Sequence, residues 1–108
     1  MISEEQIQAV VRRIVEGYAP DKIILFGSYA YGEPHEHSDL DLLIIKEKAE
    51  AKRAERAATI WTLLWGTPEL LPMDILIRTP EELATRAELY YTVEAQALQK
   101  GRLLYANV

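Results

Sequence analysis

Two aspartates, Asp39 and Asp41, stand one residue apart at the start of an apolar run, 42–45. Side chains alternate between the faces of a strand, so both carboxylates would point the same way, ~6.6 Å apart along the backbone. Strand interiors disfavour aspartate, and two like charges on one face repel unless a cation lies between them. Because Mg²⁺ selects carboxylate oxygens, commonly together with substrate phosphates, the pair predicts a Mg²⁺ site. A loop cap at Asp39 and a solvated strand start at Asp41 would also explain such a pair taken alone.

A third carboxylate and a Gly-Ser pair could complete this site. Asp74 interrupts the apolar stretch 73–78, and it could join the aspartate pair around one ion if the two strands are neighbours. The alternative for Asp74 is a strand-start residue at the water edge. Gly27 and Ser28 follow another apolar run, where a glycine lets the backbone approach a phosphate closely. The amides that open a following helical turn, and the Ser28 hydroxyl, could donate to its anionic oxygens. Taken alone, Gly-Ser is equally typical of a turn.

These residues need strands and helices to position them. Apolar runs bounded by turn residues predict strands, and apolar residues three and four apart predict helices. Ser3 and Gln6 form a capping box before the first helix, which we expect Gly17 and Pro20 to stop. In chain order we expect a helix at about 4–16, a strand at 22–26, a helical turn at 29–31, a loop at 32–38, a strand at 39–45, a helix at about 47–65, a loop at 66–72, a strand at 73–78, a helix from 80 to about 100 and a candidate edge strand at 103–105.

The order of these elements and the composition bound the class of protein. Strands separated by helices predict an α+β fold, with a small mixed β-sheet and helices packed on one face, in a single domain spanning 1–108. The absence of cysteine rules out disulfides and thiolate metal sites. The net charge of −5 argues against bulk binding of nucleic acid, which relies on lysine and arginine. No apolar stretch reaches membrane-spanning length, and the first residues lack a signal peptide's pattern, so we expect a cytoplasmic protein.

The spacing of these residues matches a known motif. Gly27-Ser28, ten residues, and then Asp39-Leu40-Asp41 before LLII resembles the GS-x10-DxD motif of the DNA polymerase β-type nucleotidyltransferase superfamily. The short length is similar to that of the minimal nucleotidyltransferase (MNT) domain, the stand-alone palm of that superfamily. The resemblance covers nearly the whole chain, and the strand aspartate Asp74 and the ending ALQKGRLLY also fit it.

The resemblance implies both an activity and a partner. Many MNT proteins are antitoxins that transfer AMP from ATP to a tyrosine of a HEPN-domain ribonuclease toxin. By position, Asp39 and Asp41 would be ligands of two Mg²⁺ ions, and Asp74 would bind the catalytic metal and help to activate the attacking hydroxyl. Gly27 and Ser28 would hold the triphosphate of the nucleotide.

Two other functions remain open at this stage. The chain could be a non-catalytic antitoxin that occludes its toxin, or it could transfer a nucleotide to a small molecule or an RNA end. Several other residues point to no specific chemistry. We expect the histidines of the loop to be solvated, the tryptophans to lie in the core or at an interface, and the tyrosines after Ser28 to pack under the loop; these residues are His35, His37, Trp61, Trp65, Tyr29 and Tyr31.

Overall fold

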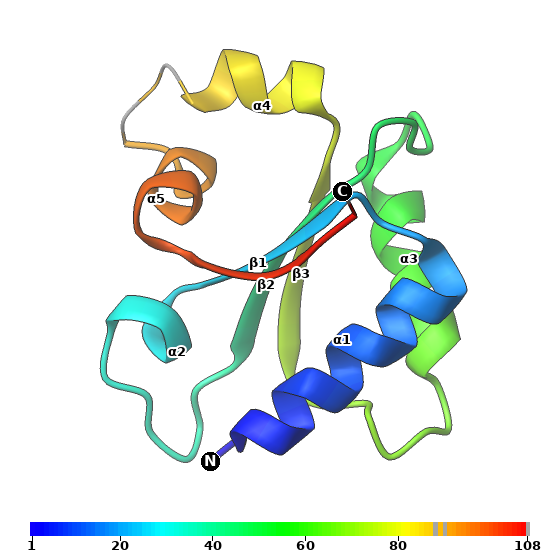
Figure 1. Ribbon diagram of the computed structural model, residues 1–108, viewed down its shortest axis with the longest axis vertical. Helices are drawn as coiled ribbons and strands as arrows, with labels where there is room; N and C mark the ends of the chain where they lie inside the picture. Colours follow the sequence, from blue (N-terminus) through cyan, green and yellow to red (C-terminus); the bar gives the residue numbers. More distant parts are fainter. Residues whose placement is uncertain (88, 90, 108) are drawn as a thin grey trace.

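The chain folds around one four-stranded sheet in the order β3-β2-β1-β4. The computed structural model describes residues 1–87, 89 and 91–107, and Figure 1 shows the helices arranged around the sheet. The elements are α1 (Glu4–Tyr18), β1 (Lys22–Phe26), α2 (Ser28–Tyr31), β2 (Leu40–Ile45), α3 (Arg53–Leu64), β3 (Met73–Arg78), α4 (Pro80–Ala87), α5 (Val93–Lys100) and β4 (Arg102–Ala106).

The sheet contains both antiparallel and parallel strand pairs. β1 and β2 are antiparallel, as are β1 and β4, whereas β2 and β3 are parallel and joined through α3. A parallel pair requires a crossover, which a helix usually provides. The predicted α+β class with a small mixed sheet is therefore confirmed.

Helices cover both faces of the sheet, so the expectation of helices on one face is wrong. The core on one side joins α1 and α3 to alternate strand residues such as Leu40, Leu42 and Ile44. The core on the other side joins Leu43 and Ile45, with their neighbours in β1, to residues of α4 and α5. β2 is apolar at both alternating sets of positions because both of its faces are buried, a pattern common in strands packed on two sides.

Two predicted helix boundaries, the end of α1 and the start of α3, differ from those observed. α1 continues through Gly17 to Tyr18, and its end is capped by Ala19 in the left-handed conformation. A Cβ at Gly17 would lie 2.2 Å from Leu63 Cδ1, so this glycine allows α1 to approach the side chain of Leu63 rather than stopping the helix. α3 begins only at Arg53, six residues after the expected start.

The expected helix from 80 to 100 is two helices. α4 ends at Ala87, and Thr92 caps α5 by accepting a hydrogen bond from the Ala95 amide. Two positions of the expected helix, 88 and 90, lie outside the described residues. Among the described residues, no helix is both long and apolar enough to cross a membrane.

Candidate active site

Asp41 and Asp74 lie opposite each other on neighbouring strands. They are Cα partners in the parallel register of β2 and β3, and Phe26, the last residue of β1, is the antiparallel partner of Asp41. The end of β1 and the starts of β2 and β3 therefore meet at one end of the sheet. Asp39 lies just before β2 and is exposed to solvent, so the strand begins one residue later than expected.

The carboxyl group of Asp41 has an unfavourable environment for a negative charge. Its burial, together with the charges of Asp74 and Asp39, raises the pKa of Asp41 to about 6. Burial and like charges both disfavour the ionised form of a carboxyl group. The three aspartates are therefore close enough to interact electrostatically, and a cation beside Asp41 would relieve the repulsion.

Gly27 brings its backbone against the Asp41 carboxylate. It has φ +73° and ψ −156°, a conformation that is essentially restricted to glycine. A Cβ at this position would lie 2.1 Å from Asp41 Oδ2, so any side chain would collide with the carboxylate. Glycine is required here for its conformation and for its lack of a side chain.

Ser28 begins the short helix that follows this contact. The carbonyl of Gly27 accepts hydrogen bonds from the amides of Ala30 (3.0 Å) and Tyr31 (3.1 Å), which fix the turn. The first amides of a helix have no partner within it. The Gly27-Ser28 segment thus offers amide donors and a hydroxyl next to the Asp41 carboxylate.

The loop between Ser28 and Asp39 is held partly by its own hydrogen bonds. The His35 amide donates to Ser38 Oγ over 2.9 Å, and the His37 amide donates to His35 Nδ1 over 3.1 Å. Both histidines are exposed, as expected. Beyond the loop, the Leu40 amide donates to the Pro72 carbonyl over 3.0 Å, which aligns the start of β2 with the residue before β3.

The donor set of this site is of the kind that binds magnesium. In the part of the chain that the structure describes, no three His, Asp or Glu side chains already stand in an arrangement that could hold a metal ion. The three carboxylates nevertheless supply oxygen ligands alone, the type that Mg²⁺ prefers. Their mutual repulsion at Asp41 is also consistent with a cation site.

A comparison with protein families identifies the family of this chain. Residues 5–104 match the model of the nucleotidyltransferase domain family. The chain belongs to this family. The match includes both strands that carry aspartates and the Gly27-Ser28 segment between β1 and the aspartate pair.

Two curated relatives of this nucleotidyltransferase domain are bifunctional uridylyltransferase/uridylyl-removing enzymes. The protein from Methylococcus capsulatus is 35% identical over 97 residues, which are 89% of this chain and 11% of the relative. The protein from Pseudomonas putida is 38% identical over 72 residues, which are 66% of this chain and 8% of the relative. The chain thus spans about a tenth of the length of these relatives.

Two solved structures share the fold of this nucleotidyltransferase domain. A protein from Sulfolobus solfataricus described as a nucleotidyltransferase has a TM-score of 0.65 and 16% identity, covering 95% of this chain and 79% of that one. A structure described as a toxin-antitoxin with AMP-PNP has a TM-score of 0.59 and 20% identity, covering 94% of this chain and 73% of that one. Identities this low support the fold alone.

The site also has surroundings that the sequence did not predict. A hollow of about 600 Å³ borders Asp39 and is lined otherwise by apolar residues of α3, the loop after it and the start of β3. Trp65, one of its walls, is 78% exposed. The pair of tryptophans four residues apart was the available signal, but the pattern could not separate an exposed interface from a core.

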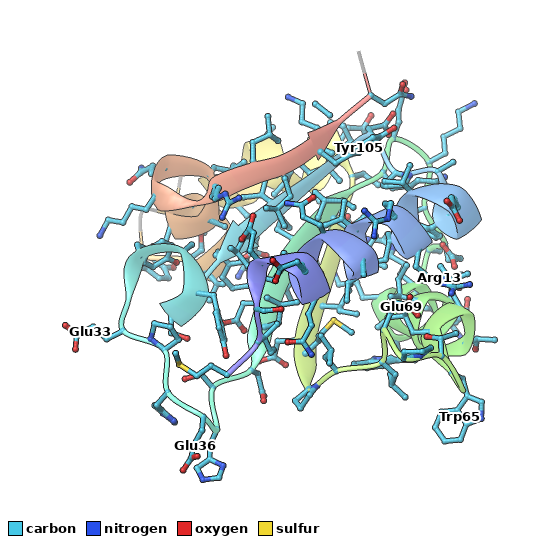
Figure 2. The ribbon with its side chains drawn as sticks, turned by 60° about the horizontal axis from the view of Figure 1, so that its bottom comes forward. Arg13, Glu33, Glu36, Trp65, Glu69 and Tyr105 are labelled. Atoms are coloured by element: carbon cyan, nitrogen blue, oxygen red, sulfur yellow. The ribbon has the colours of Figure 1, made fainter. Side chains whose placement is uncertain are left out.

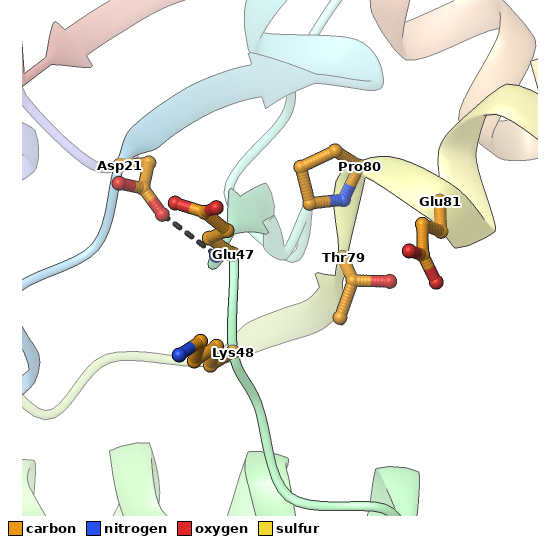
Figure 3. A pocket seen from close by; sticks show the side chains of 6 residues that line it. All are labelled: Asp21, Glu47, Lys48, Thr79, Pro80 and Glu81. Atoms are coloured by element: carbon orange, nitrogen blue, oxygen red, sulfur yellow. Dashed lines mark hydrogen bonds between the residues drawn. The ribbon is translucent and has the colours of Figure 1, made fainter.

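A second hollow, of about 500 Å³, lies at the opposite end of the strands. It is lined by Asp21, Glu47, Lys48, Thr79, Pro80 and Glu81. Figure 3 shows these side chains around the end of β2, with the Asp21 carboxylate accepting a hydrogen bond from the Glu47 amide. This hollow includes none of the aspartates of the candidate active site.

Proposed function

We propose that this nucleotidyltransferase domain transfers AMP from ATP to a tyrosine hydroxyl of a partner HEPN-type toxin, with Mg²⁺ as cofactor. The observation that carries the proposal is the alignment of Asp41 with Asp74 across β2 and β3, with the Gly27 backbone against the Asp41 carboxylate. In this proposal the carboxylates are the metal ligands, and the turn that Gly27 opens beside them holds the phosphates.

Each residue has a distinct role in the proposed reaction. Asp39 and Asp41 would hold two Mg²⁺ ions, and Asp74 would be a further ligand that also helps to activate the attacking hydroxyl. When bound, Mg²⁺ supplies Lewis-acid stabilisation of the charge on the phosphoryl oxygens. The amides after Gly27 and the Ser28 hydroxyl donate hydrogen bonds to the triphosphate, which orients the α-phosphate for attack.

The proposed transfer exchanges one phosphorus–oxygen bond for another. The tyrosine oxygen bonds to the α-phosphorus, the bond to the β-phosphate oxygen breaks, and pyrophosphate leaves. Asp74 lies on the outer strand of the sheet, where it can accept the hydroxyl proton from an acceptor that approaches from outside. The structural likeness to a toxin-antitoxin with AMP-PNP supports the choice of partner and nucleotide.

UMP transfer from UTP is the second candidate. It is favoured by the 35% identity to an enzyme described as a uridylyltransferase, over most of this chain. The carboxylates and the phosphate-holding turn would serve both nucleotides equally. Only contacts with the base would distinguish them.

The test is label transfer from nucleotides labelled at the α-phosphate. The protein, Mg²⁺ and the purified HEPN-type partner are incubated with labelled ATP or labelled UTP, and the label on the partner is measured on a denaturing gel. We expect label from ATP with the wild type and a loss of at least 100-fold in the Asp41→Asn and Asp74→Asn variants, by analogy with the loss of a preorganised electrostatic group. Glu16→Gln, at an exposed position of α1, is the matched carboxylate control and should keep full activity.

The other outcomes assign other functions. Label from UTP alone would support uridylyl transfer. If the aspartate variants still neutralise the toxin and no label is transferred, the chain acts by occlusion and the enzymatic proposal is wrong. If label appears on a small molecule or an RNA end in the absence of the partner, that molecule is the acceptor and the proposed protein acceptor is wrong.

A further inference from the structure

An apolar groove runs from Asp39 along the end of α3. We define the tryptophan groove by its lining residues, Asp39, Trp61, Trp65, Leu70, Leu71, Pro72 and Met73. A smaller hollow of about 300 Å³ lies against both tryptophans and Thr62. Figure 2 shows Trp65 projecting from the molecule, away from the ribbon. Large exposed apolar residues that border a hollow are typical of an interaction surface.

The wall of the tryptophan groove is fixed before any partner binds. The Thr67 amide and hydroxyl both donate to the Leu64 carbonyl, over 3.0 and 2.7 Å, and the Leu70 amide donates to the Thr67 carbonyl over 3.2 Å. Arg13 of α1 pairs with Glu69 over 3.3 Å, and Figure 2 shows these two side chains together. A preformed wall reduces the ordering cost of binding.

The chemistry of the lining selects the kind of ligand. Its one formally charged residue is Asp39, so away from the Mg²⁺ proposed at that end the groove offers no cation to a phosphate, and a nucleic-acid backbone lying along the tryptophans is a poor occupant. Trp61 is half-buried and packs against the core, whereas the side chain of Trp65 is exposed and accessible to a partner. Tryptophan and proline surfaces suit aromatic and aliphatic side chains, and tryptophan is enriched among residues that dominate binding energy.

The position of the groove identifies the occupant. Because Asp39 lines it, a ligand lying on the tryptophans has one end at the carboxylates of the candidate active site. We propose that the tryptophan groove binds the acceptor protein through an apolar segment that carries the modified tyrosine. This inference rests on the proposed function for the identity of the acceptor. The carboxylates would bind metal ions, and the groove would bind the acceptor protein itself.

The test uses the groove's own fluorescence. The chain has two tryptophans, both in the groove, and Trp61→Phe leaves Trp65 as the sole indole. This variant is titrated with the HEPN-type partner in buffer without nucleotide or Mg²⁺, so that binding is measured without chemistry. We expect the Trp65 emission to shift to shorter wavelength and to be protected from acrylamide quenching. Two controls are measured in the same way. One is a titration with ATP and Mg²⁺, and the other is a dilution series of the protein alone.

A pair of variants connects the groove to transfer. In the label assay, Trp65→Ala should raise the KM for the partner roughly 30-fold, as expected for a binding hot spot, and leave kcat unchanged. Leu103→Ala removes an apolar side chain that is 56% exposed on β4, at the other edge of the sheet. It should leave both constants unchanged.

The outcomes separate this inference from the proposed function. If the partner is labelled normally but neither protects Trp65 nor responds to Trp65→Ala, the inference is wrong and the proposed function stands. If the partner protects Trp65 and no label is ever transferred, the groove is a docking surface and the proposed chemistry fails. Protection by nucleotide alone would make the groove a base-stacking surface, and protection lost on dilution would make it a contact between two copies; either result overturns the inference.

Discussion

The proposed chemistry requires Asp41 to be ionised, and its ionisation reduces the stability of the folded protein. Its pKa is raised from 3.8 to about 6 by burial and by the neighbouring aspartates. The folded protein therefore binds this proton more tightly than the unfolded chain does. Between these two values stability falls as the pH rises, and above pH 6 the whole cost of ionising Asp41 is present.

Asp41→Asn should therefore stabilise the protein while abolishing transfer. At pH 7 without divalent ions, we expect a gain of about 1 kcal/mol, reduced by the partial exposure of the carboxyl group, and a melting temperature higher by roughly 4 °C. The gain should shrink as the pH falls from 6 to 4, because Asp41 becomes protonated in the folded wild type while the unfolded chain approaches its own pKa of 3.8. Thermal unfolding of both proteins between pH 4 and 7 measures this. An equal or lower stability of the variant at pH 7 would show that Asp41 is not under electrostatic stress.

Gly27 is the second residue with a specific requirement. Gly27→Ala should destabilise the protein by about 2 kcal/mol, because the backbone conformation is strained for any side chain and the added methyl group meets Asp41 Oδ2. Displacement of the carboxylate should also reduce transfer at least tenfold. Denaturant unfolding and the label assay measure the two effects.

Gly66→Ala is the control for Gly27→Ala. Gly66 also has a positive φ, +76°, but nothing lies within 4 Å of a Cβ placed there. It should show a smaller destabilisation and normal nucleotide binding. If both variants lose activity equally, the contact between Gly27 and Asp41 is not what matters.

At the scale of elements, Arg56 connects α3 to β3 and α4. It is 4% exposed, donates to the Ile77 carbonyl over 3.1 Å and pairs with Glu82 over 2.7 Å. Glu82 in turn caps α4 by accepting from the Thr79 amide over 2.8 Å. The hydrogen bond from Arg56 is the main cause that lowers the pKa of Glu82 to about 2.

Arg56→Ala should destabilise the protein by about 3–5 kcal/mol, since it removes the guanidinium that donates to the partly buried Glu82 carboxylate and to the Glu50 carbonyl. Arg53→Ala removes a half-exposed arginine that lies 3.9 Å from the same Glu82, and it should cost less than about 0.5 kcal/mol. Urea unfolding of both variants makes the comparison. Equal effects would mean that charge near Glu82, rather than the buried contacts of Arg56, is what stabilises this region.

The same pair has a defined pH dependence. Because the pKa of Glu82 is depressed in the folded state, its contribution is complete above about pH 4.5 and is lost as the pH falls towards 2. The Arg56→Ala variant should lose stability less steeply than the wild type over this range.

The sequence predicted the elements better than their limits. The apolar runs predicted the ranges of β1, β2 and β3 almost residue for residue. A short apolar stretch between turn residues is too short for a typical helix and is therefore most often a buried strand. The break between α4 and α5 was missed, since the surrounding residues are good helix formers and the signal was the lone cap residue Thr92. Gly17 looked like a helix stop, but its role is contact with Leu63, which depends on a distant part of the chain.

The candidate site shows the same limit of local information. The spacing of Gly27, Ser28, Asp39 and Asp41 is local and could be read directly. The opposition of Asp74 to Asp41 depends on strand order and register, which we could state only as a condition. The tryptophan groove is assembled from segments around Asp39, α3 and β3, so no periodicity within one segment could predict it.

At the scale of the whole molecule, the candidate site combines three strands at one end of the sheet. A ligand that contacts Gly27 after β1, Asp41 on β2 and Asp74 on β3 binds only when all three strands are in place. Such a ligand stabilises the folded state by mass action, by about 2.7 kcal/mol at a hundred times its dissociation constant.

We therefore expect Mg²⁺ with a non-hydrolysable ATP analogue to raise the melting temperature by roughly 10 °C at a hundred times its dissociation constant. The Asp41→Asn/Asp74→Asn double variant should show little of this rise, and Glu16→Gln should show all of it. Differential scanning fluorimetry with and without EDTA measures the shift. A full shift in the double variant would place the nucleotide elsewhere on the molecule.

β3 is an outer strand of the sheet, and this has a consequence for self-association. An outer strand presents unpaired backbone groups on which another chain can add a strand, and proteins discourage this with charge and proline. Pro72 precedes β3, and Asp74 is exposed near its start, whereas Arg78 at its end is buried and paired with Glu94. The exposed charge on this strand is therefore a carboxylate proposed for chemistry, and we expect its replacement to favour strand addition at this edge as well as to alter the site.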